Sequence, residues 1–205
     1  MIKNIVFDFG QVMVRFEPAY MVSRYVSDRT DAALLEEVIF DRLYWDKLDA
    51  GTISDSEVVE SSKKRLPERL HGYVEDIYYN WIYNIPEING IWERVRYVKE
   101  KYGARVFLLS NISEYFAAHE NEIPVLSEFE KCIYSAVCGS VKPSREIFEY
   151  LCDTCDILPS ETVFVDDNKN NIEGAERFGI TGYLFDGDAK KLREYLDGIL
   201  KNKCD

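Results

Sequence analysis

Short apolar runs rich in β-branched and aromatic residues recur along the chain, and each of them predicts a buried β-strand. These runs occupy residues 2–7, 105–109, 132–137, 162–165 and 180–185. Between the runs, apolar side chains return every three or four positions, as Ile147, Leu151 and Cys155 do, and this spacing predicts amphipathic helices. Short buried strands that alternate with helices are typical of a parallel sheet with right-handed crossovers. The pattern therefore predicts an α/β fold with a doubly wound parallel sheet.

Residues 17–85 interrupt this alternation, because they carry charged, helix-like patterns and no convincing strand. Helix starts are expected at Ser27–Asp28 and at Ser54, since such side chains accept hydrogen bonds from the free N–H groups of a first helical turn. The simplest arrangement is a helical insertion that follows the first strand and lies over the open edge of the sheet. We therefore expect two domains, an α/β core made of residues 1–16 and 88–205 and a helical cap made of residues 17–87.

The composition adds a strongly acidic character to this picture. The 205 residues include 25 Lys and Arg against 37 Asp and Glu, which gives a net charge of −12. Such a charge repels nucleic acids and anionic membranes, so we expect neither as a partner. No apolar run approaches the roughly 20 residues that span a bilayer, and the short apolar stretch at the amino terminus does not resemble a secretory signal. We therefore expect a cytoplasmic protein.

The cysteines are odd in number and crowded into the second half of the chain, which favours reduced thiols over a disulfide framework. They are Cys132, Cys138, Cys152, Cys155 and Cys204. Cys152 and Cys155 form a CxxC pair, but a zinc site needs about four ligands and no second such pair lies nearby. We interpret the pair as thiols partly in the core on one face of a helix, with a metal or redox role as the alternative.

Polar residues gather where four of the predicted strands end. The clusters are Asp8–Phe9–Gly10, Ser110–Asn111, Lys142–Pro143 and Asp166–Asp167–Asn168. Doubly wound sheets bind their ligands at the carboxyl ends of the strands, so we expect these clusters to meet at one site. Each cluster alone is weak support for a function, because an aspartate after a strand is often a turn or cap residue. Together, and in this order, they predict a catalytic site.

The residue types in these clusters suit phosphoryl transfer to a carboxylate. One aspartate can attack phosphorus, and acidic oxygens can hold a hard cation such as Mg²⁺ against the phosphoryl group. A lysine and a hydroxyl group can stabilise the charge that spreads over the phosphoryl oxygens. Gly10 leaves room for a phosphate to approach the backbone. The sequence therefore predicts a magnesium-assisted reaction at phosphorus.

The segments that carry these clusters also resemble a known family. The opening FDFGQVMVRFEP, the Ser-Asn pair, the segment VKPSREIF and the tail VFVDDNKNNIEGAERFGI are together similar to the four motifs of the haloacid dehalogenase superfamily, in the same order. The helical insertion resembles the C1 cap of its subfamily IA. The opening and the tail are most similar to bacterial sugar phosphatases of the α-D-glucose-1-phosphate phosphatase kind. The resemblance covers essentially the whole chain.

This resemblance implies a role for each motif residue. Asp8 is the expected nucleophile, which forms an aspartyl-phosphate, and Lys142 is the expected lysine that pairs with both Asp8 and the phosphoryl group. The implied phosphate-binding residues are Phe9, Gly10, Ser110, Asn111 and Lys142. The implied Mg²⁺ ligands are Asp8, the main-chain carbonyl of Gly10, and Asp167, with Asp166 and Asn171 as supporting residues around them. The family's last acidic position is Asn171 here, which leaves one charge fewer around the metal.

Gly10 is the main departure from the family pattern. Most phosphatases of this superfamily have a second aspartate at that position, which protonates the leaving oxygen and later activates water. Its absence leaves three interpretations: an easily departing leaving group, a substitute such as Asp166, a cap carboxylate or water, or a protein that has lost catalysis and binds a ligand or partner. General acid–base catalysis contributes about 10²–10⁴-fold to a rate, so the three interpretations predict very different activities.

A haloacid dehalogenase is the alternative enzyme, because those relatives also lack the second aspartate of motif one. They need no metal, however, whereas the pair Asp166–Asp167 builds a cation site, and they place an aromatic residue where Gly10 stands. We therefore expect a magnesium-dependent phosphatase for a small phosphorylated metabolite, specifically a sugar phosphate, that acts as a monomer or a homodimer.

The insertion resembles the cap loop that covers the active site in these relatives, and its polar residues are candidates for substrate specificity. The candidates are Arg15, Trp45, Asp46, Lys47 and Asp49. The alternative is that the tryptophan packs inside the cap, that the cap charges are solvated, and that Arg15 forms a surface salt bridge.

Overall fold

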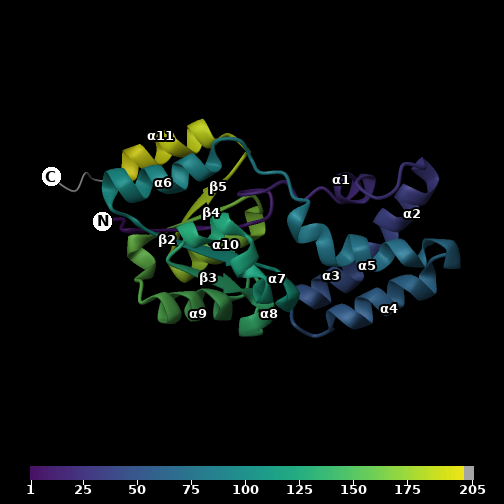
Figure 1. Cartoon of the computed structure of the whole chain (residues 1–205). Helices are drawn as coiled ribbons and strands as arrows, with labels where there is room; N and C mark the ends of the chain where they lie inside the picture. The colour runs from purple at the N-terminus through teal and green to yellow at the C-terminus, as the bar shows by residue number, and fades with distance from the viewer. Residues whose placement is uncertain (201–205) are drawn as a thin grey trace.

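The centre of the molecule is a parallel sheet whose strands follow one another in the order β3-β2-β1-β4-β5 (Figure 1). The computed structural model describes residues 1–200. The strands are β1 (Asn4–Phe7), β2 (Arg105–Ser110), β3 (Lys131–Tyr134), β4 (Thr162–Asp166) and β5 (Thr181–Leu184). Every pairing between neighbouring strands is parallel, and the order reverses at β1, which lies between β2 and β4. The doubly wound α/β fold expected from the sequence is confirmed.

Helices cover both faces of the sheet, which explains why the middle residues of the central strands are consecutive apolar residues. Ile5 and Phe7 of β1 pack into one cluster with α6 (Ile91–Tyr102) and α11 (Ala189–Ile199). On the other face, side chains such as Val6 and Phe164 pack against another pair of helices. These are α9 (Arg145–Cys155) and α10 (Lys169–Phe178). Figure 1 shows α6 and α11 side by side on one side of the sheet.

One predicted strand is too long. The apolar run 132–137 was expected to be a strand throughout, but β3 ends at Tyr134 and the next residues form the short helix α8 (Ser135–Cys138). Tyr134 pairs with Ser110, the last residue of β2, so no strand continues beside residue 135. The backbone of Ala136 and the side chain of Ser135 instead bond to Ile112 in the loop that follows β2.

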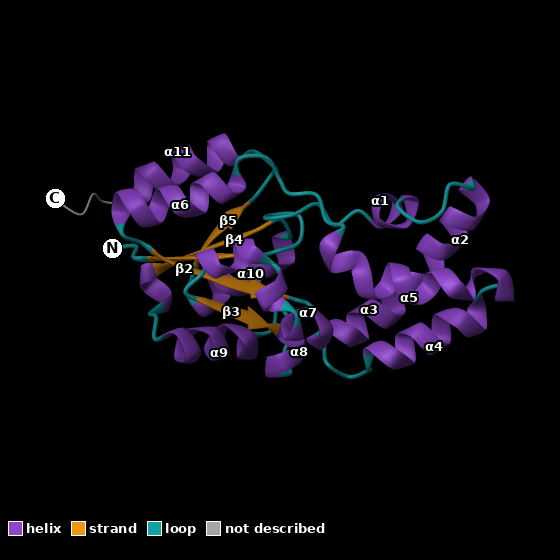
Figure 2. Ribbon diagram, viewed as in Figure 1, coloured by secondary structure: helices purple, strands orange, loops and turns teal. Residues whose placement is uncertain are grey.

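The segment between β1 and α6 is helical, as expected. Its helices are α1 (Pro18–Ser23), α2 (Arg29–Ile39), α3 (Arg42–Asp49), α4 (Asp55–Arg65) and α5 (His71–Asn80). Asp28 caps α2, and Ser54 caps α4 in a reciprocal arrangement with Glu57, so both predicted helix starts are confirmed. Figure 2 shows these helices together, beyond the end of the sheet at which α7 (Glu114–Ala118) and α8 lie. None of the described helices is both long and apolar enough to cross a membrane.

Short 3-10 turns complete the described elements. They are η1 (Glu68–Leu70), η2 (Trp81–Tyr83), η3 (Glu120–Glu122), η4 (Pro124–Glu128) and η5 (Pro159–Glu161). Cys152 and Cys155 lie on the buried face of α9 as free thiols, as predicted. Cys204 lies outside the described residues.

The helical segment leaves the core and returns to it at one place. The backbone N–H of Arg15 donates to the carbonyl of Pro86 at 2.7 Å, and the N–H of Ile88 donates to the carbonyl of Met13 at 3.0 Å. Val14 and Glu87 lie opposite each other in an antiparallel bridge. The two connecting segments therefore run side by side as a short two-stranded ribbon.

A chain of aromatic rings joins the helical segment to the core. The ring centre of Phe9, next to Asp8, lies 4.9 Å from that of Phe116 in α7. The ring of Phe116 in turn stacks on that of Trp81, with 5.7 Å between their centres. Trp81 in turn meets Trp45 of α3 edge to face at 5.5 Å. Each such pair is worth roughly 0.5–1.5 kcal/mol beyond the area it buries. These contacts hold α3 over the carboxyl ends of the strands.

The turn after α3 is docked on α8. The hydroxyl of Ser135 donates to the carbonyl of Asp49 at 2.5 Å. Two residues later, Gly51 has a φ of +66° and approaches the backbone of Ala136 closely. A Cβ atom at residue 51 would lie 2.7 Å from the carbonyl oxygen of Ala136, so only glycine fits there without a backbone shift.

Replacing Gly51 by alanine is therefore expected to lower the free energy of unfolding by about 2–4 kcal/mol. Two costs add together: the strain of alanine in a left-handed backbone conformation, and the clash of its Cβ atom with the backbone of Ala136. The matched control is Gly72→Ala in α5, where a Cβ meets nothing within 4 Å and alanine should stabilise by about 0.5–1 kcal/mol. Urea unfolding of both variants checks this. Equal midpoints for Gly51→Ala and the unmodified protein would contradict the close packing.

Candidate active site

Three of the predicted clusters meet where β1, β2 and β4 end, because these strands are neighbours in the sheet. Asp8 directly follows β1, and its backbone N–H donates to Val165 of β4 at 2.9 Å. Ser110 is the last residue of β2, and Asp166 is the last residue of β4. Lys142 does not directly follow a strand, because the whole of α8 intervenes between β3 and this lysine.

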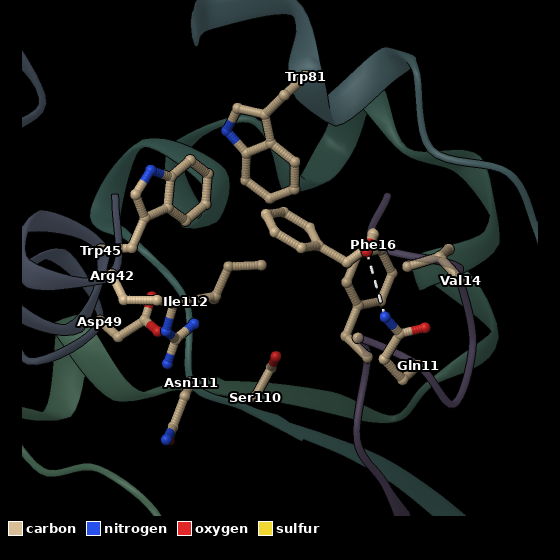
Figure 3. A pocket seen from close by; sticks show the side chains of 12 residues that line it. Gln11, Val14, Phe16, Arg42, Trp45, Asp49, Trp81, Ser110, Asn111 and Ile112 are labelled. Carbon is tan, nitrogen blue, oxygen red and sulfur yellow. Dashed lines mark hydrogen bonds between the residues drawn. The ribbon is translucent and has the colours of Figure 1, made fainter. Parts of the chain in front are cut away.

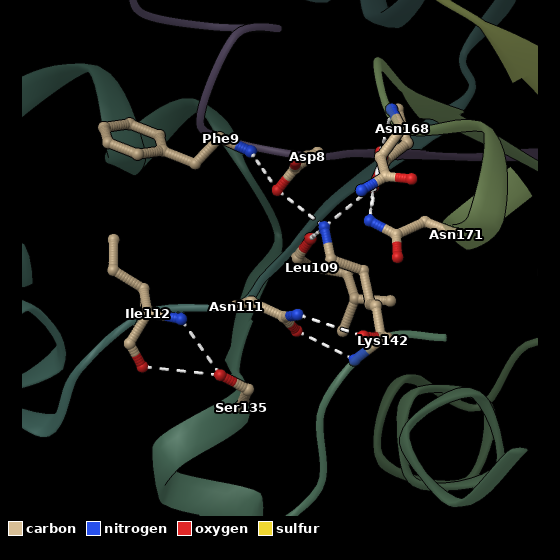
Figure 4. A network of polar contacts seen from close by, with 10 residues as sticks. Asp8, Phe9, Leu109, Asn111, Ile112, Ser135, Lys142, Asn168 and Asn171 are labelled. Atoms are coloured by element: carbon tan, nitrogen blue, oxygen red, sulfur yellow. Dashed lines mark hydrogen bonds and ion pairs between the residues drawn. The ribbon is translucent and has the colours of Figure 1, made fainter. Parts of the chain in front are cut away.

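The buried amine of Lys142 joins these strand ends (Figure 4). Its Nζ lies 2.7 Å from Asp8 Oδ1 and 2.8 Å from Asp166 Oδ2, and it donates to the carbonyl of Leu109 at 3.0 Å. Only 4% of the residue is exposed. Burial alone would lower the pKa of this amine, but the two carboxylates raise it above the usual value. Lys142 is therefore a fixed positive charge beside Asp8.

Asn111 holds the backbone that carries this lysine. Its side-chain oxygen accepts from the N–H of Lys142 at 2.8 Å, and its amide group donates to the carbonyl of Lys142 at 3.1 Å. These two hydrogen bonds connect the loop after β2 to the loop after α8. Asn111 thus positions Lys142 from the opposite side of the site.

Asp166 is fully buried and surrounded by donors. Besides Lys142, it accepts from the N–H of Asn168 at 2.7 Å and from the side-chain amide of Asn171 at 3.0 and 3.2 Å. Asn168 also caps α10, which carries Asn171. An acidic side chain at residue 171 would repel Asp166, whereas the amide donates to it. The asparagine at this position therefore suits the packing of the site.

Asp8 and Asp167 complete an oxygen-rich cluster. Burial is the main cause that raises the pKa of Asp8 to about 7, although Lys142 acts against it. Burial and the neighbouring Asp166 also raise the pKa of Asp167. Asp8, Asp166 and Asp167 each offer one carboxylate oxygen within 4.8 Å of the others. Hard oxygen donors around a site short of positive charge suit Mg²⁺, so these residues fit that cation.

A cavity of about 260 Å³ opens beside this cluster (Figure 3). It is lined by Phe9, Gly10, Gln11, Val14, Phe16, Arg42, Trp45, Asp49, Trp81, Ser110, Asn111 and Ile112. In Figure 3, the rings of Trp45, Trp81 and Phe16 gather at one side of the cavity, and the polar ends of Asp49 and Ser110 lie at the other. The cavity thus has the lining of a small-molecule site, mostly apolar with a few polar groups.

A family model described as haloacid dehalogenase-like hydrolase matches residues 2–179. The chain belongs to this family. It is 27% identical over 190 residues to a D-ribitol-5-phosphate phosphatase of Bacteroides thetaiotaomicron, a match that covers 87% of this chain and 89% of that protein.

Solved structures share the fold of this haloacid dehalogenase-like hydrolase. One is an aspartate-to-alanine mutant of a family enzyme from Bacteroides thetaiotaomicron in complex with magnesium and inorganic phosphate, with a TM-score of 0.70 and 18% identity over 94% of this chain and 99% of that chain. Another is the L-2-haloacid dehalogenase of Xanthobacter autotrophicus, with a TM-score of 0.65 and 16% identity over 100% of this chain and 91% of that chain. At these identities the likeness shows the fold alone.

Several other predicted site residues line the cavity of this hydrolase. Gly10 lies at its edge, where a Cβ atom would meet nothing within 4 Å. The backbone N–H of Phe9 donates to Asp8 Oδ1 at 2.7 Å, so it is already engaged by the carboxylate. Trp45 is buried and donates from its indole N–H to the carbonyl of Ile39 at 2.7 Å, which fixes its ring in the wall.

Three of the specificity candidates lie elsewhere. Arg15, Asp46 and Lys47 are exposed and are not among the residues that line the cavity. Asp46 instead forms an ion pair of 2.5 Å with Arg42, one helical turn away. Asp49 is the acidic candidate of this loop that reaches the cavity.

Two polar residues of the cavity were missed from the sequence. Arg42 stands three residues before Trp45 and seven before Asp49, so helical spacing alone could have placed all three on one face of α3. Gln11 adopts a φ of +56° and donates from its side chain to the carbonyl of Phe16 at 3.1 Å. Because glutamine rarely takes this conformation, the sequence carries no signal for it.

Proposed function

We propose that this chain is a magnesium-dependent phosphatase that hydrolyses a small phosphorylated metabolite, specifically a sugar phosphate, through an aspartyl-phosphate on Asp8. The observation that carries the proposal is the buried Lys142 that contacts both Asp8 and Asp166, at 2.7 and 2.8 Å. A fixed cation beside a carboxylate at a strand end suits phosphoryl transfer, in which positioning and charge do most of the work. The phosphatase named among the relatives supports the same chemistry.

In this mechanism an oxygen of Asp8 attacks phosphorus, and the bond to the leaving oxygen breaks. The amine of Lys142 stabilises the negative charge on the phosphoryl oxygens, and the hydroxyl of Ser110 at the cavity floor donates to one of them. Water then attacks phosphorus and releases inorganic phosphate from Asp8. Bound by Asp8, the carbonyl of Gly10 and Asp167, Mg²⁺ would supply further neutralisation of the phosphoryl charge.

We also propose that residues 17–87 act as a cap domain on a core made of residues 1–16 and 88–205. The support comes from the cavity, which takes its walls from both parts: Trp45 and Asp49 come from α3, whereas Ser110 and Ile112 come from the core. A cap in this position excludes bulk water during phosphoryl transfer.

Phosphate release from a panel of sugar phosphates and nitrophenyl phosphate tests the proposed function. Release should require Mg²⁺ and stop when a chelator is added. Asp167→Asn should raise the Mg²⁺ concentration for half-maximal rate by about tenfold or more, because one charged ligand is lost. Asp153→Asn, which removes an exposed carboxylate from α9, is the matched control and should leave that concentration unchanged.

Two results would contradict the assignment as a magnesium-dependent phosphatase. Release that persists in chelator would contradict the metal dependence. Halide release from a haloacid, with no phosphate released from any ester, would replace the phosphatase by a dehalogenase.

A further inference from the structure

The missing side chain at Gly10 leaves the proposed reaction without a proton donor at the usual place. A sugar oxygen is a poor leaving group unless it gains a proton as the P–O bond breaks. Asp166 is a poor substitute, because it already accepts hydrogen bonds from Lys142, Asn168 and Asn171 and is fully buried. A Cβ atom at residue 10 would meet nothing within 4 Å, so the space beside Gly10 is open to a group from another element.

Asp49 is a carboxylate of the cavity that Gly10 also lines. It is the last residue of α3 and lines the same cavity as Gly10 and Ser110 (Figure 3). Among the residues that the structure describes, it is the only carboxylate in the cavity lining. Its side chain has no hydrogen-bond or ion-pair partner within residues 1–200, and it is half-buried. A carboxyl group in this position is free to exchange a proton with a ligand.

The backbone of Asp49 is tied to the phosphate-binding side of the site. Ser135 Oγ donates to the carbonyl of Asp49 at 2.5 Å and accepts from the N–H of Ile112 at 2.9 Å. Ile112 stands two residues after Ser110 on the same loop. The close approach of Gly51 to Ala136 fixes the turn that follows. The hydroxyl of Ser135 therefore connects the backbone of Asp49 to the loop that follows Ser110.

Burial and the neighbouring charges shift the pKa of Asp49 to a value that suits both the release and the uptake of a proton. Burial raises the pKa of its carboxyl group to about 6, with Asp46 on the same helix acting in the same direction. Arg42 from α3 and Lys142 from the core act against it. A pKa near the working pH is the most effective value for general acid–base catalysis.

We propose that Asp49 takes the place of the acid that is missing at residue 10, as a catalytic residue supplied by the cap. This inference rests on the proposed phosphatase function. As an Asp8 oxygen bonds to phosphorus, the bond from phosphorus to the leaving oxygen breaks, and that oxygen takes the proton of Asp49 to become an alcohol. A water oxygen then bonds to phosphorus, the bond to Asp8 breaks, and the ionised Asp49 takes the proton of the water.

The test compares Asp49→Asn with Glu60→Gln, which neutralises an exposed carboxylate on α4 of the same helical segment. For the best alkyl phosphate of the panel, Asp49→Asn should lower kcat/KM by about 10²-fold or more. For nitrophenyl phosphate the loss should stay below about tenfold, because nitrophenolate departs without a proton. Glu60→Gln should match the unmodified protein on both substrates.

A pH profile separates proton transfer from substrate binding. With the alkyl phosphate, kcat/KM of the unmodified protein should fall as pH rises through the pKa of Asp49, because the acid must be protonated. Asp49→Asn should lack this fall. The double variant Asp49→Asn, Gly10→Asp returns a carboxylate to the usual place, and it should recover at least about tenfold of the lost rate.

Three results would overturn the proposal. One is an equal loss on both substrates, which would make Asp49 a contact for the body of the substrate. Another is a rate for Asp49→Asn equal to that of Glu60→Gln, and the third is a folded double variant that recovers nothing. Failure of the phosphatase function itself would appear differently, as an absence of phosphate release from the unmodified protein.

Discussion

Replacing Asp8 by asparagine is expected to abolish phosphate release, by at least about 10⁴-fold, while the protein stays folded. The amide cannot attack phosphorus, so no aspartyl-phosphate forms, and loss of a catalytic nucleophile typically costs this much or more. Phosphate release under saturating Mg²⁺ measures the effect. A variant with the rate of the unmodified protein would exclude Asp8 as the nucleophile.

A thermal melt of the metal-free variant shows that the loss is chemical. Burial raises the pKa of Asp8, which means that the folded protein disfavours its ionised form. A neutral asparagine avoids this cost, and Lys142 still has Asp166 as a partner at 2.8 Å. The melting temperature of Asp8→Asn should therefore be no lower than that of the unmodified protein at neutral pH. A clearly lower value would mean that Asp8 holds the fold together.

Replacing Lys142 by methionine is expected to affect both stability and rate. Lys142 is 4% exposed and its amine contacts two carboxylates, so its loss leaves buried negative charges without a partner. Removing one partner of a buried ion pair costs about 3–5 kcal/mol in free energy of unfolding. Phosphate release should fall by at least about 10²–10³-fold, because the charge that stabilises the phosphoryl oxygens is gone. Urea unfolding and the release assay measure the two effects.

A charge-balanced variant controls for this change. Adding Asp166→Asn to Lys142→Met removes one of the uncompensated carboxylates, and about 1–3 kcal/mol of the lost stability should return. The rate should not return, because the amine is still absent. If Lys142→Met unfolds at the same urea concentration as the unmodified protein, the buried charge network contributes nothing to the fold.

The strands could be located from the sequence because both faces of the sheet are covered. Val6 and Phe7 point to opposite faces and are both fully buried, so the strand ends in three consecutive apolar residues, Ile5 to Phe7, instead of an alternating pattern. The end of β3 was misplaced for a tertiary reason. Ser135 bonds to Ile112 in another loop, and an apolar run carries no sign of that contact.

The candidate site was predictable where it follows from local motifs and less so where the helical segment packs on the sheet. Asp8, Ser110 and Asp166 stand at strand ends, where the expected sheet brings them together. The lining of the cavity depends instead on how α3 sits on the core. Ring contacts such as that of Phe116 with Trp81 set that placement, and they join residues far apart in the sequence. Helical spacing places Arg42 on the same face of α3 as Trp45 and Asp49, but only this packing shows that the face lines the cavity.

The two-stranded ribbon at residues 13–15 and 86–88 has a consequence for how this molecule can change over evolution. Because the chain leaves and returns through adjacent, hydrogen-bonded segments, the two points at which the helical segment joins the core lie side by side. A change in the length of the segment between them leaves this junction in place, although apolar side chains of the segment share one cluster with those of the core. The expected nucleophile Asp8 and the amine of Lys142 thus belong to the core, whereas the proposed proton donor Asp49 belongs to the inserted segment. Exchange of this segment can therefore change the substrate preference and keep the reaction only if the new segment again places a proton donor where Asp49 lies.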